Sequence, residues 1–440
     1  MILRKVNSKD LFKYETKEKI MFFLFTILPI SLLSGPLIPE IIIIILSFFF
    51  ILYGKNFCEN ICIRLFISFL LLTFISTLIS KYTYVDKIAT KNLLKSFFHF
   101  RFLLLFLLVI FILQNKKYQN IFYTTIKLIL IFLFFDVCWQ SFSGQDIFGN
   151  PKSAIGRLSG PYNNEYIIGG VILKFFLIYF IIFFEKNKFT LKYLLEFIFF
   201  INGTLLSIML SGERSTFFLF LLLILIFIIL CVFLSKKYIL YLSLISFIIF
   251  SPIHLYYSKF IFSRFADVNY NSQQMDLKII KLDKINNFFL LMKDSGYYAH
   301  YYSATSLFKN NIFFGVGQRN FRIACSEIVN SEHVEIFIKK NNLDEESFKQ
   351  NLCTTHPHNM YLEILAETGL LGFISFLTFL IFFALRIIKS KKFYLLVPLI
   401  VTFFPFVTTG SFFNNFNSIF IFLILGVIYS NISNKNFFSA

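Results

Sequence analysis

Charged residues are scarce in this chain of 440 residues. They make up 15% of the sequence, against roughly 25% in soluble domains, while hydrophobic residues reach 57%. Such a composition excludes a single soluble core and a disordered chain, because the first needs a polar surface and the second has few apolar residues. A bilayer-spanning helix needs ~20 mostly apolar residues. The sequence therefore predicts an all-α, polytopic integral membrane helix bundle.

Cysteine is also scarce, and its spacing argues against a metal site. The six cysteines include no Cys-x-x-Cys pair and no adjacent histidine pair of the kind that binds zinc. We therefore predict neither a metal nor a cofactor. Cys325 and Cys353 lie in the same long polar connection, and a bridge between them and two free thiols both stay open.

Acidic residues are few relative to basic ones. The chain has 24 Asp and Glu against 42 Lys and Arg, a formal charge of +18. In a soluble protein such an excess would suggest nucleic-acid binding. Here the basic residues cluster at the ends of apolar runs, where they act as topology signals. We therefore expect membrane lipids as partners and no nucleic acid.

Twelve apolar runs separated by charged breaks predict about 12 transmembrane helices, and eleven is the alternative. The runs are 20–34, 37–53, 61–80, 93–113, 121–141, 165–184, 191–210, 216–234, 238–256, 361–385, 393–410 and 415–431. The first 19 residues are polar and basic, so we expect no cleaved signal. With a cytoplasmic N-terminus, the short inner connections carry 18 Lys and Arg and the outer ones carry 6, which favours this orientation.

One connection, 257–360, is far longer than the others and should lie on the periplasmic side. We therefore divide the chain into transmembrane helices 1–9 (1–256), a large periplasmic loop (257–360) and transmembrane helices 10–12 (361–440), all within one membrane domain. Loops of this length are usually functional. Within it the sequence predicts an interfacial helix at 276–292, a helix at 297–309 and a solvated helix at 331–350.

Two arginines on the predicted outer face are candidate binding residues. Arg214 follows Glu213 in a tight turn between two apolar runs, and Arg157 lies in the polar connection IFGNPKSAIGRLSGPYNNEY. A charge held near the membrane interior is costly and favours a functional role. The alternative for Arg214 is snorkelling to headgroups or pairing with Glu213.

The large loop ends in a candidate base. His356 and His358 stand in the run THPHNMYLEIL, directly before an apolar segment, and histidine titrates near neutral pH. Asn359 predicts an N-cap, and the positive end of the following helix would keep His358 neutral. The alternatives are a solvated loop histidine and a metal ligand, although a third ligand at typical spacing is missing.

Four segments, in order, resemble the O-antigen ligase and polymerase superfamily. In chain order they are RLSGPYNNEY (157–166), SGERSTFF (211–218), NNIFFGVGQRNF (310–321) and HNMYLEILAETGLLG (358–372). The resemblance covers roughly residues 150–380. It implies an enzyme, a membrane glycosyltransferase of the bacterial inner membrane whose active site faces the periplasm. Its donor would be a glycan on undecaprenyl pyrophosphate.

The resemblance also implies roles for individual residues. His358 would be the catalytic base on the acceptor hydroxyl, and Arg214 would bind the pyrophosphate. The superfamily usually carries a further arginine in the outer loop, and the corresponding stretch KDSGYYAHYYSATSLF has none. Four residues could take the place of this arginine: Lys293, His300, Arg264 and Arg319. The predicted substrate-binding residues are Arg214, Arg157, Arg264, Arg319 and His300.

Ligase and polymerase readings share the donor and differ in the acceptor. A ligase would use a lipid A-core sugar, and a polymerase would use a lipid-linked repeat unit. We take the ligase as the first hypothesis. A lipid-linked glycan transporter is the competing class, and it should place charges along a path through the bundle. Here the candidate charges gather on the outer face, with Lys174 as an exception, and a purely structural subunit would leave the motifs unexplained.

Overall fold

The computed structural model describes residues 8–53, 61–83, 87–153, 156–163, 165–185, 190–233, 241, 243, 245–253, 256 and 296–432. These residues form helices and no strand. The helices of the bundle are α1 (Ser8–Ser31), α2 (Leu37–Tyr53), α3 (Ile61–Thr83), α4 (Lys87–Phe98), α5 (Arg101–Leu113), α6 (Lys116–Ser143), α7 (Ile168–Glu185), α8 (Leu191–Ser211), α9 (Arg214–Phe233), α16 (Met360–Lys389), α17 (Leu396–Thr402) and α18 (Asn415–Ile432). Short 3₁₀ turns are η1 (Leu32–Ser34), η2 (Gly160–Tyr162) and η4 (Phe393–Leu395).

The all-α membrane bundle predicted from the sequence is confirmed. Eight helical segments of the described residues are long and apolar enough to cross a membrane, and α2 and the η4–α17 segment are shorter apolar helices. The predicted run 93–113 is interrupted by a turn between α4 and α5. The predicted run 238–256 is described only in part, so the count of twelve stays a prediction.

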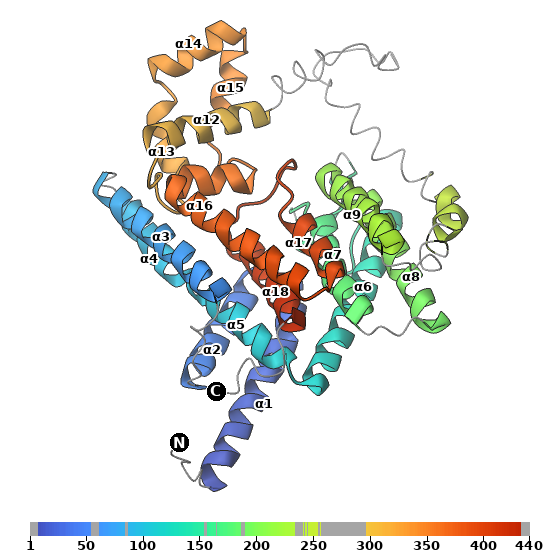
Figure 1. Cartoon of the computed structure of the whole chain (residues 1–440). Helices are drawn as coiled ribbons and strands as arrows, with labels where there is room; N and C mark the ends of the chain where they lie inside the picture. Colours follow the sequence, from blue (N-terminus) through green and yellow to red (C-terminus); the bar gives the residue numbers. More distant parts are fainter. Residues whose placement is uncertain are drawn as a thin grey trace.

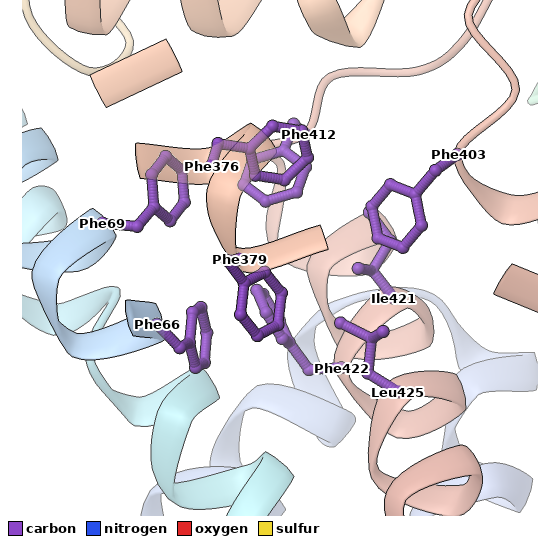
Figure 2. A pocket seen from close by; sticks show the side chains of 9 residues that line it. All are labelled: Phe66, Phe69, Phe376, Phe379, Phe403, Phe412, Ile421, Phe422 and Leu425. Atoms are coloured by element: carbon purple, nitrogen blue, oxygen red, sulfur yellow. The ribbon is translucent and has the colours of Figure 1, made fainter. Parts of the chain in front are cut away.

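Phenylalanine packing holds the centre of the bundle together. α3 packs along α16, and α5 packs along α18. Phe66 of α3 stacks on Phe379 of α16 and on Phe422 of α18, with ring centroids 5.2 Å and 4.9 Å apart. Figure 2 shows the crevice between these helices, which is lined only by aromatic and aliphatic side chains. Large rings supply most of the apolar contact area here, so this region stabilises the fold and offers no polar group for chemistry.

A small helical cap covers the end of the bundle where α16 begins (Figure 1). It consists of α12 (Gly296–Asn310), α13 (Phe321–Ile328), α14 (Glu332–Asn341) and α15 (Glu345–Leu352). The cap has its own core, and a disulfide joins Cys325 of α13 to Cys353 at the end of α15. The sequence left open whether Cys325 and Cys353 form a bridge or stay as free thiols, and the structure has the bridge.

The helices predicted within the loop are partly confirmed. α12 matches the helix predicted at 297–309. The single helix predicted at 331–350 is wrong, because the chain turns at Asn342, where φ is +49°, and begins again at an Asp344 N-cap. The segment 276–292 lies outside the described residues.

Helix α16 is broken near its middle, and a turn of the preceding loop repairs the break. Gly369 has φ +65° and ψ −168°, which interrupts the helical hydrogen bonds. Residues 312–317 fill the gap through four backbone hydrogen bonds. They run from Val316 N to Ala366 O (2.9 Å), from Gly317 N to Glu367 O (2.8 Å), from Leu370 N to Ile312 O (2.7 Å) and from Leu371 N to Phe313 O (3.3 Å). A broken membrane helix is tolerated where protein groups satisfy its backbone in this way. We call this contact between residues 312–317 and the Gly369 break the glycine junction.

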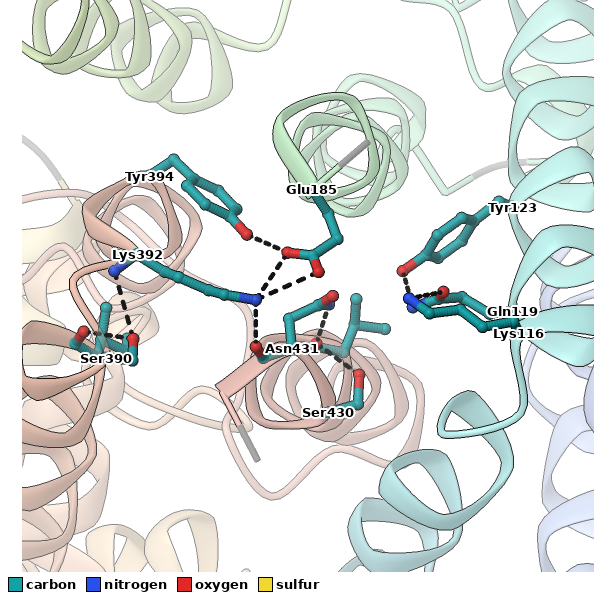
Figure 3. Close-up of polar contacts among 11 residues, drawn as sticks. Lys116, Gln119, Tyr123, Glu185, Ser390, Lys392, Tyr394, Ser430 and Asn431 are labelled. Atoms are coloured by element: carbon teal, nitrogen blue, oxygen red, sulfur yellow. Dashed lines mark hydrogen bonds and ion pairs between the residues drawn. The ribbon is translucent and has the colours of Figure 1, made fainter. Parts of the chain in front are cut away.

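Polar contacts tie the bundle together just after α16 ends, at the opposite end of that helix from the cap. Figure 3 shows these contacts. Lys392 pairs with Glu185 of α7 at 3.0 Å and donates to Asn431 O of α18 at 2.8 Å. The hydroxyl of Tyr394 donates to Glu185 as well. These contacts join α7, α18 and η4, so we call them the inner clamp.

Candidate active site

Three histidines meet at the start of α16, where the cap contacts the bundle. The ring of His358 lies 5.1 Å from that of His300 on α12 and 4.2 Å from that of His356, measured between centroids. Tyr297 lies 5.8 Å from His358. We call His300, His356 and His358 the histidine cluster. The sequence predicts His358 and His300 as separate members of the site, and the structure brings their rings together.

The cluster is arranged to stay uncharged. Burial and the neighbouring imidazoles of His356 and His300 lower the pKa of His358 to about 4. Burial also lowers the pKa of His300 and of His356. The Nδ1 atom of His300 lies 2.5 Å from Asn351 O, and a carbonyl only accepts, so we assign the proton to Nδ1. Neutral imidazoles can accept a proton or contact a sugar hydroxyl.

The backbone around His358 is fixed from both sides. His358 itself has φ +54°, and its carbonyl accepts a hydrogen bond from Thr409 N at 2.8 Å. The next residue, Asn359, caps α16, because its Oδ1 accepts from Tyr361 N at 3.0 Å and from Leu362 N at 3.1 Å. This confirms the predicted N-cap. The cap places His358 at the positive end of the helix dipole.

A second polar group surrounds the turn between α8 and α9. The Glu213 carboxylate accepts from Gly169 N at 2.6 Å, from Gly170 N at 3.0 Å and from the Thr216 hydroxyl at 2.8 Å. Burial raises the pKa of Glu213, while these hydrogen bonds and the charge of Arg157 lower it. Glu213 therefore fixes the start of α9, where Arg214 stands, against the start of α7.

Arg157 belongs to this second group. Its Nη2 donates to Tyr166 O at 2.9 Å, and its guanidinium lies 5.1 Å from the centre of the Tyr166 ring. Its Nε is buried and has no hydrogen-bond partner in the described part of the chain. Of the two arginines predicted from the sequence, Arg157 is within electrostatic range of the Glu213 carboxylate, and Arg214 follows Glu213 directly in the chain. We call Arg157, Glu213 and Arg214 the arginine group.

Arg319, a predicted binding residue, is engaged in contacts that hold the fold. Its Nε donates to Phe413 O at 2.9 Å, and its Nη2 donates to the same oxygen and to Asn415 Oδ1, at 2.5 and 2.6 Å. Its backbone N–H donates to Glu367 at 2.7 Å. These contacts connect the glycine junction to the start of α18 and favour a structural role. Arg264 and Lys293 lie outside the described residues.

Two buried carboxylates on α16 also hold loops. Glu363 accepts from the Ser411 hydroxyl and from Phe412 N, the latter at 2.7 Å. Glu367 accepts from the backbone of Arg319 and, at 3.3 Å, of Phe321. The sequence pattern identified these glutamates as part of the motif and did not give their role. Their place within an apolar helix was the signal that they need partners.

A metal-binding arrangement was the alternative reading of His-Pro-His. In the stretches that the structure describes, no group of three or more His, Cys, Asp and Glu side chains could hold a metal ion. Sequence reasoning also missed Tyr297, which lies beside both His300 and His358. Its position one helical turn before His300 was the available signal.

A family model described as O-antigen ligase matches residues 197–377. This match supports the O-antigen ligase superfamily to which the sequence motifs point. The matched region begins in α8 and ends in α16, so it contains Arg214, the cap and the histidine cluster. The search of curated proteins gave no match. Together with the membrane helices, the match supports a membrane glycosyltransferase of the O-antigen ligase and polymerase type, a family whose substrates are lipid-linked polysaccharides.

Proposed function

We propose that this protein is an O-antigen ligase of the bacterial inner membrane. It would transfer a glycan from undecaprenyl pyrophosphate to a sugar hydroxyl of lipid A-core, on the periplasmic side. The observation that carries the proposal is the histidine cluster, in which a neutral His358 stands at the start of α16. A neutral imidazole held in a fixed position is what deprotonation of a hydroxyl requires.

The reaction follows from the charges that move. The acceptor oxygen attacks the anomeric carbon of the donor, and the bond from that carbon to the pyrophosphate oxygen breaks. A nitrogen of His358 takes the hydroxyl proton. The pyrophosphate leaves with the bonding electrons, and Arg214 and Arg157 stabilise its negative charge. The chain needs no cofactor for this scheme, because the lipid pyrophosphate is itself the leaving group.

The low pKa of His358 has a mechanistic consequence. An imidazole with a pKa of about 4 is neutral at pH 7 but accepts protons poorly. A nearby anion favours the charged form of a base and raises its pKa. Binding of the pyrophosphate donor would therefore turn His358 into a stronger base only when substrate is present.

The inner clamp supports an enzyme over a transporter. Alternating access requires helices to separate at each end of the bundle in turn. Here Glu185, Lys392 and Asn431 join α7, η4 and α18 at the end away from the histidine cluster. A reaction at one face needs no such opening, so the clamp is compatible with a fixed scaffold.

The same proposal includes the orientation and the division of the chain. Residues 1–256 and 361–440 would form the membrane-spanning parts, and 257–360 would form the periplasmic loop, with both termini cytoplasmic. A Ser331→Cys variant tests this with a membrane-impermeant thiol reagent. Labelling of intact spheroplasts is expected. Labelling only after lysis of the inner membrane would reverse the orientation.

The base assignment is tested by glycan transfer in liposomes with purified lipid-linked donor and a chelator. His358→Ala should lower turnover about 10²- to 10⁴-fold, the usual contribution of a positioned base, with protein level and donor binding unchanged. His356→Ala is the matched control and should lose much less. Arg214→Lys should also weaken transfer, because lysine lacks the bidentate fork. Wild-type turnover by His358→Ala would disprove the base, and inhibition by the chelator alone would disprove the metal-free scheme.

The ligase and polymerase readings separate in a gene deletion. Electrophoresis of lipopolysaccharide from the deletion strain should show loss of all capped species if the protein is a ligase. A shift to capping by a single repeat unit would instead identify a polymerase. Complementation with His358→Ala should reproduce the deletion pattern in either case.

A further inference from the structure

Helix α7 is buried by its neighbours along almost its whole length, and only a few of its residues are partly exposed. Every residue of α7 is buried apart from Gly170, Lys174 and Glu185. Glu185 ends the helix in the inner clamp. Gly170 and Lys174 are four residues apart and therefore lie on the same face. Helices α6, α8, α9 and α18 all pack around α7, and apart from its last residue they cover the face with Gly170 and Lys174 least completely.

Lys174 is directed along this face toward the arginine group. It lies six residues after Ile168, about 9 Å down the helix at 1.5 Å per residue. Side chains in a helix tilt toward the N-terminus, so the amine of Lys174 extends back toward the start of α7. Gly170 stands on that path without a side chain, and the Lys174 amine is within electrostatic range of Glu213.

A polar residue of α18 holds the amine in place. Lys174 Nζ donates to Asn417 Oδ1 at 2.9 Å, and Asn417 Nδ2 donates in turn to Ser411 O at 3.2 Å. An ammonium has three donors, and this hydrogen bond uses one of them. Within the described residues no carboxylate lies in ion-pair distance of Lys174. The amine is therefore held in place by Asn417, beside the Phe420 ring at 5.1 Å, and it retains donors for a further acceptor.

We propose that Lys174, held by Asn417, is a further binding residue for the diphosphate of the lipid-linked donor. This inference rests on the proposed function. Lys174 would act in place of the arginine that the loop stretch KDSGYYAHYYSATSLF lacks, and it would do so from a position on α7. The arginine group would contact the diphosphate at the outer end of the α7 face, and Lys174 would contact it from below. A diphosphate carries more charge than a monophosphate, so a second, deeper cation should favour it selectively.

The competing explanation is that Lys174 only balances the charge of Glu213. The Glu213 carboxylate already has three hydrogen-bond donors from Gly169, Gly170 and Thr216. A purely balancing lysine would affect stability when replaced and would leave ligand preference unchanged. Replacing a lysine that binds the ligand would change the preference for diphosphate over monophosphate. The two explanations therefore predict different ratios of the two dissociation constants.

The test measures the Kd of undecaprenyl diphosphate and of undecaprenyl monophosphate for the full-length protein in nanodiscs. Lys174→Gln keeps a donor for Asn417 and removes the charge. It should weaken diphosphate binding about 10- to 100-fold, the usual range for a hydrogen bond to a charged group, with a much smaller effect on the monophosphate. Lys127→Gln is the matched control, because Lys127 of α6 is paired with Glu196 of α8, and its diphosphate preference should be that of the wild type.

The outcomes separate the two proposals. A wild type that transfers glycan and prefers diphosphate, with an unchanged preference in Lys174→Gln, overturns the role of Lys174 alone. A wild type that neither transfers glycan nor prefers diphosphate overturns the proposed function. If Lys174→Gln does not accumulate, Asn417→Ala provides the test, because it keeps the charge and removes its anchor. It should lower the diphosphate preference several-fold, and an unchanged preference would also overturn the inference.

Discussion

The histidine cluster lies at the start of α16 and the glycine junction lies further along the same helix, at Gly369, and both include residues of segments that resemble the superfamily. At the junction, backbone groups of residues 312–317 are bonded to α16. In the cluster, three imidazoles lie against one another, and the buried Nε2 of His356 has no hydrogen-bond partner among the described residues. Segments that resemble the same superfamily thus contain two kinds of residue. Those of the glycine junction hold the fold, and those of the histidine cluster have ring nitrogens available for chemistry.

We expect the largest effect on folding from a substitution at the glycine junction, because its residues hold the fold. A Cβ atom on Gly369 would lie 2.4 Å from the backbone of Phe313, and φ there is +65°. The left-handed conformation costs about 1–2 kcal/mol for a residue with a side chain, and overpacking costs about 1–3 kcal/mol more. Gly369→Ala should therefore prevent accumulation of folded protein, as measured by size-exclusion chromatography in detergent.

Gly149→Ala is the control for conformational strain without a clash. Gly149 has φ +86°, but its Cβ would meet no atom within 4 Å. This variant should lose only about 1–2 kcal/mol and remain monodisperse. Equal behaviour of the two variants would show that the close approach at Gly369 does not matter, and the structural reading of the junction would be wrong.

The disulfide offers a second way to separate the two regions, because it belongs to the cap. It closes a loop of 28 residues between α13 and the segment before His358. In the chain-entropy model such a link stabilises by about 3–4 kcal/mol. Replacing both Cys325 and Cys353 with Ser should make the cap sensitive to protease and lower transfer, while the membrane-embedded fragments stay intact.

Limited proteolysis followed by electrophoresis measures this effect. Cys138→Ser is the control, because Cys138 is a free cysteine in α6. The same cleavage pattern in the double serine variant and the wild type would mean that the cap is held without its bridge.

Much of the fold could be predicted because the relevant signals are local. Apolar runs gave the membrane helices, and Asn359 gave the start of α16. The break at Gly369 could not be predicted, because its hydrogen bonds come from residues about 50 positions earlier in the chain. A residue such as Arg319 is equally hard to assign, since a guanidinium near a motif suits substrate and backbone carbonyls alike.

The pH dependence of stability tests whether His358 stays uncharged in the folded protein. The pKa of His358 is lowered from an ordinary value of 6.5 to about 4. As pH falls from 6.5 toward 4, the unfolded chain takes up a proton at this position and the native protein does not. Stability is therefore complete above pH 6.5 and declines as pH falls through this window. His358→Gln should show a shallower decline in thermal unfolding temperature over the same range.

The pH dependence of glycan transfer tests the same histidine during the reaction. The acid limb of kcat/KM reports the free enzyme and should fall near pH 4–5, since His358 ionises there at about 4. The acid limb of kcat reports the donor complex and should lie at higher pH, because the bound anion raises the pKa of His358. Identical limbs would contradict activation of the base by the donor.

The smallest expected effect concerns Asn359, which belongs to both regions because it caps α16 beside His358. Its Oδ1 accepts from Tyr361 N and Leu362 N, and its Nδ2 donates to Pro405 O at 2.8 Å. Loss of an N-cap side chain typically costs about 0.5–2 kcal/mol. Asn359→Ala should lower the unfolding temperature slightly and slow transfer by letting His358 move. Asn359→Asp keeps the cap acceptor and removes the donor to Pro405, so it should recover stability more fully than transfer. Full recovery of transfer by Asn359→Asp would mean that the cap alone positions the histidine.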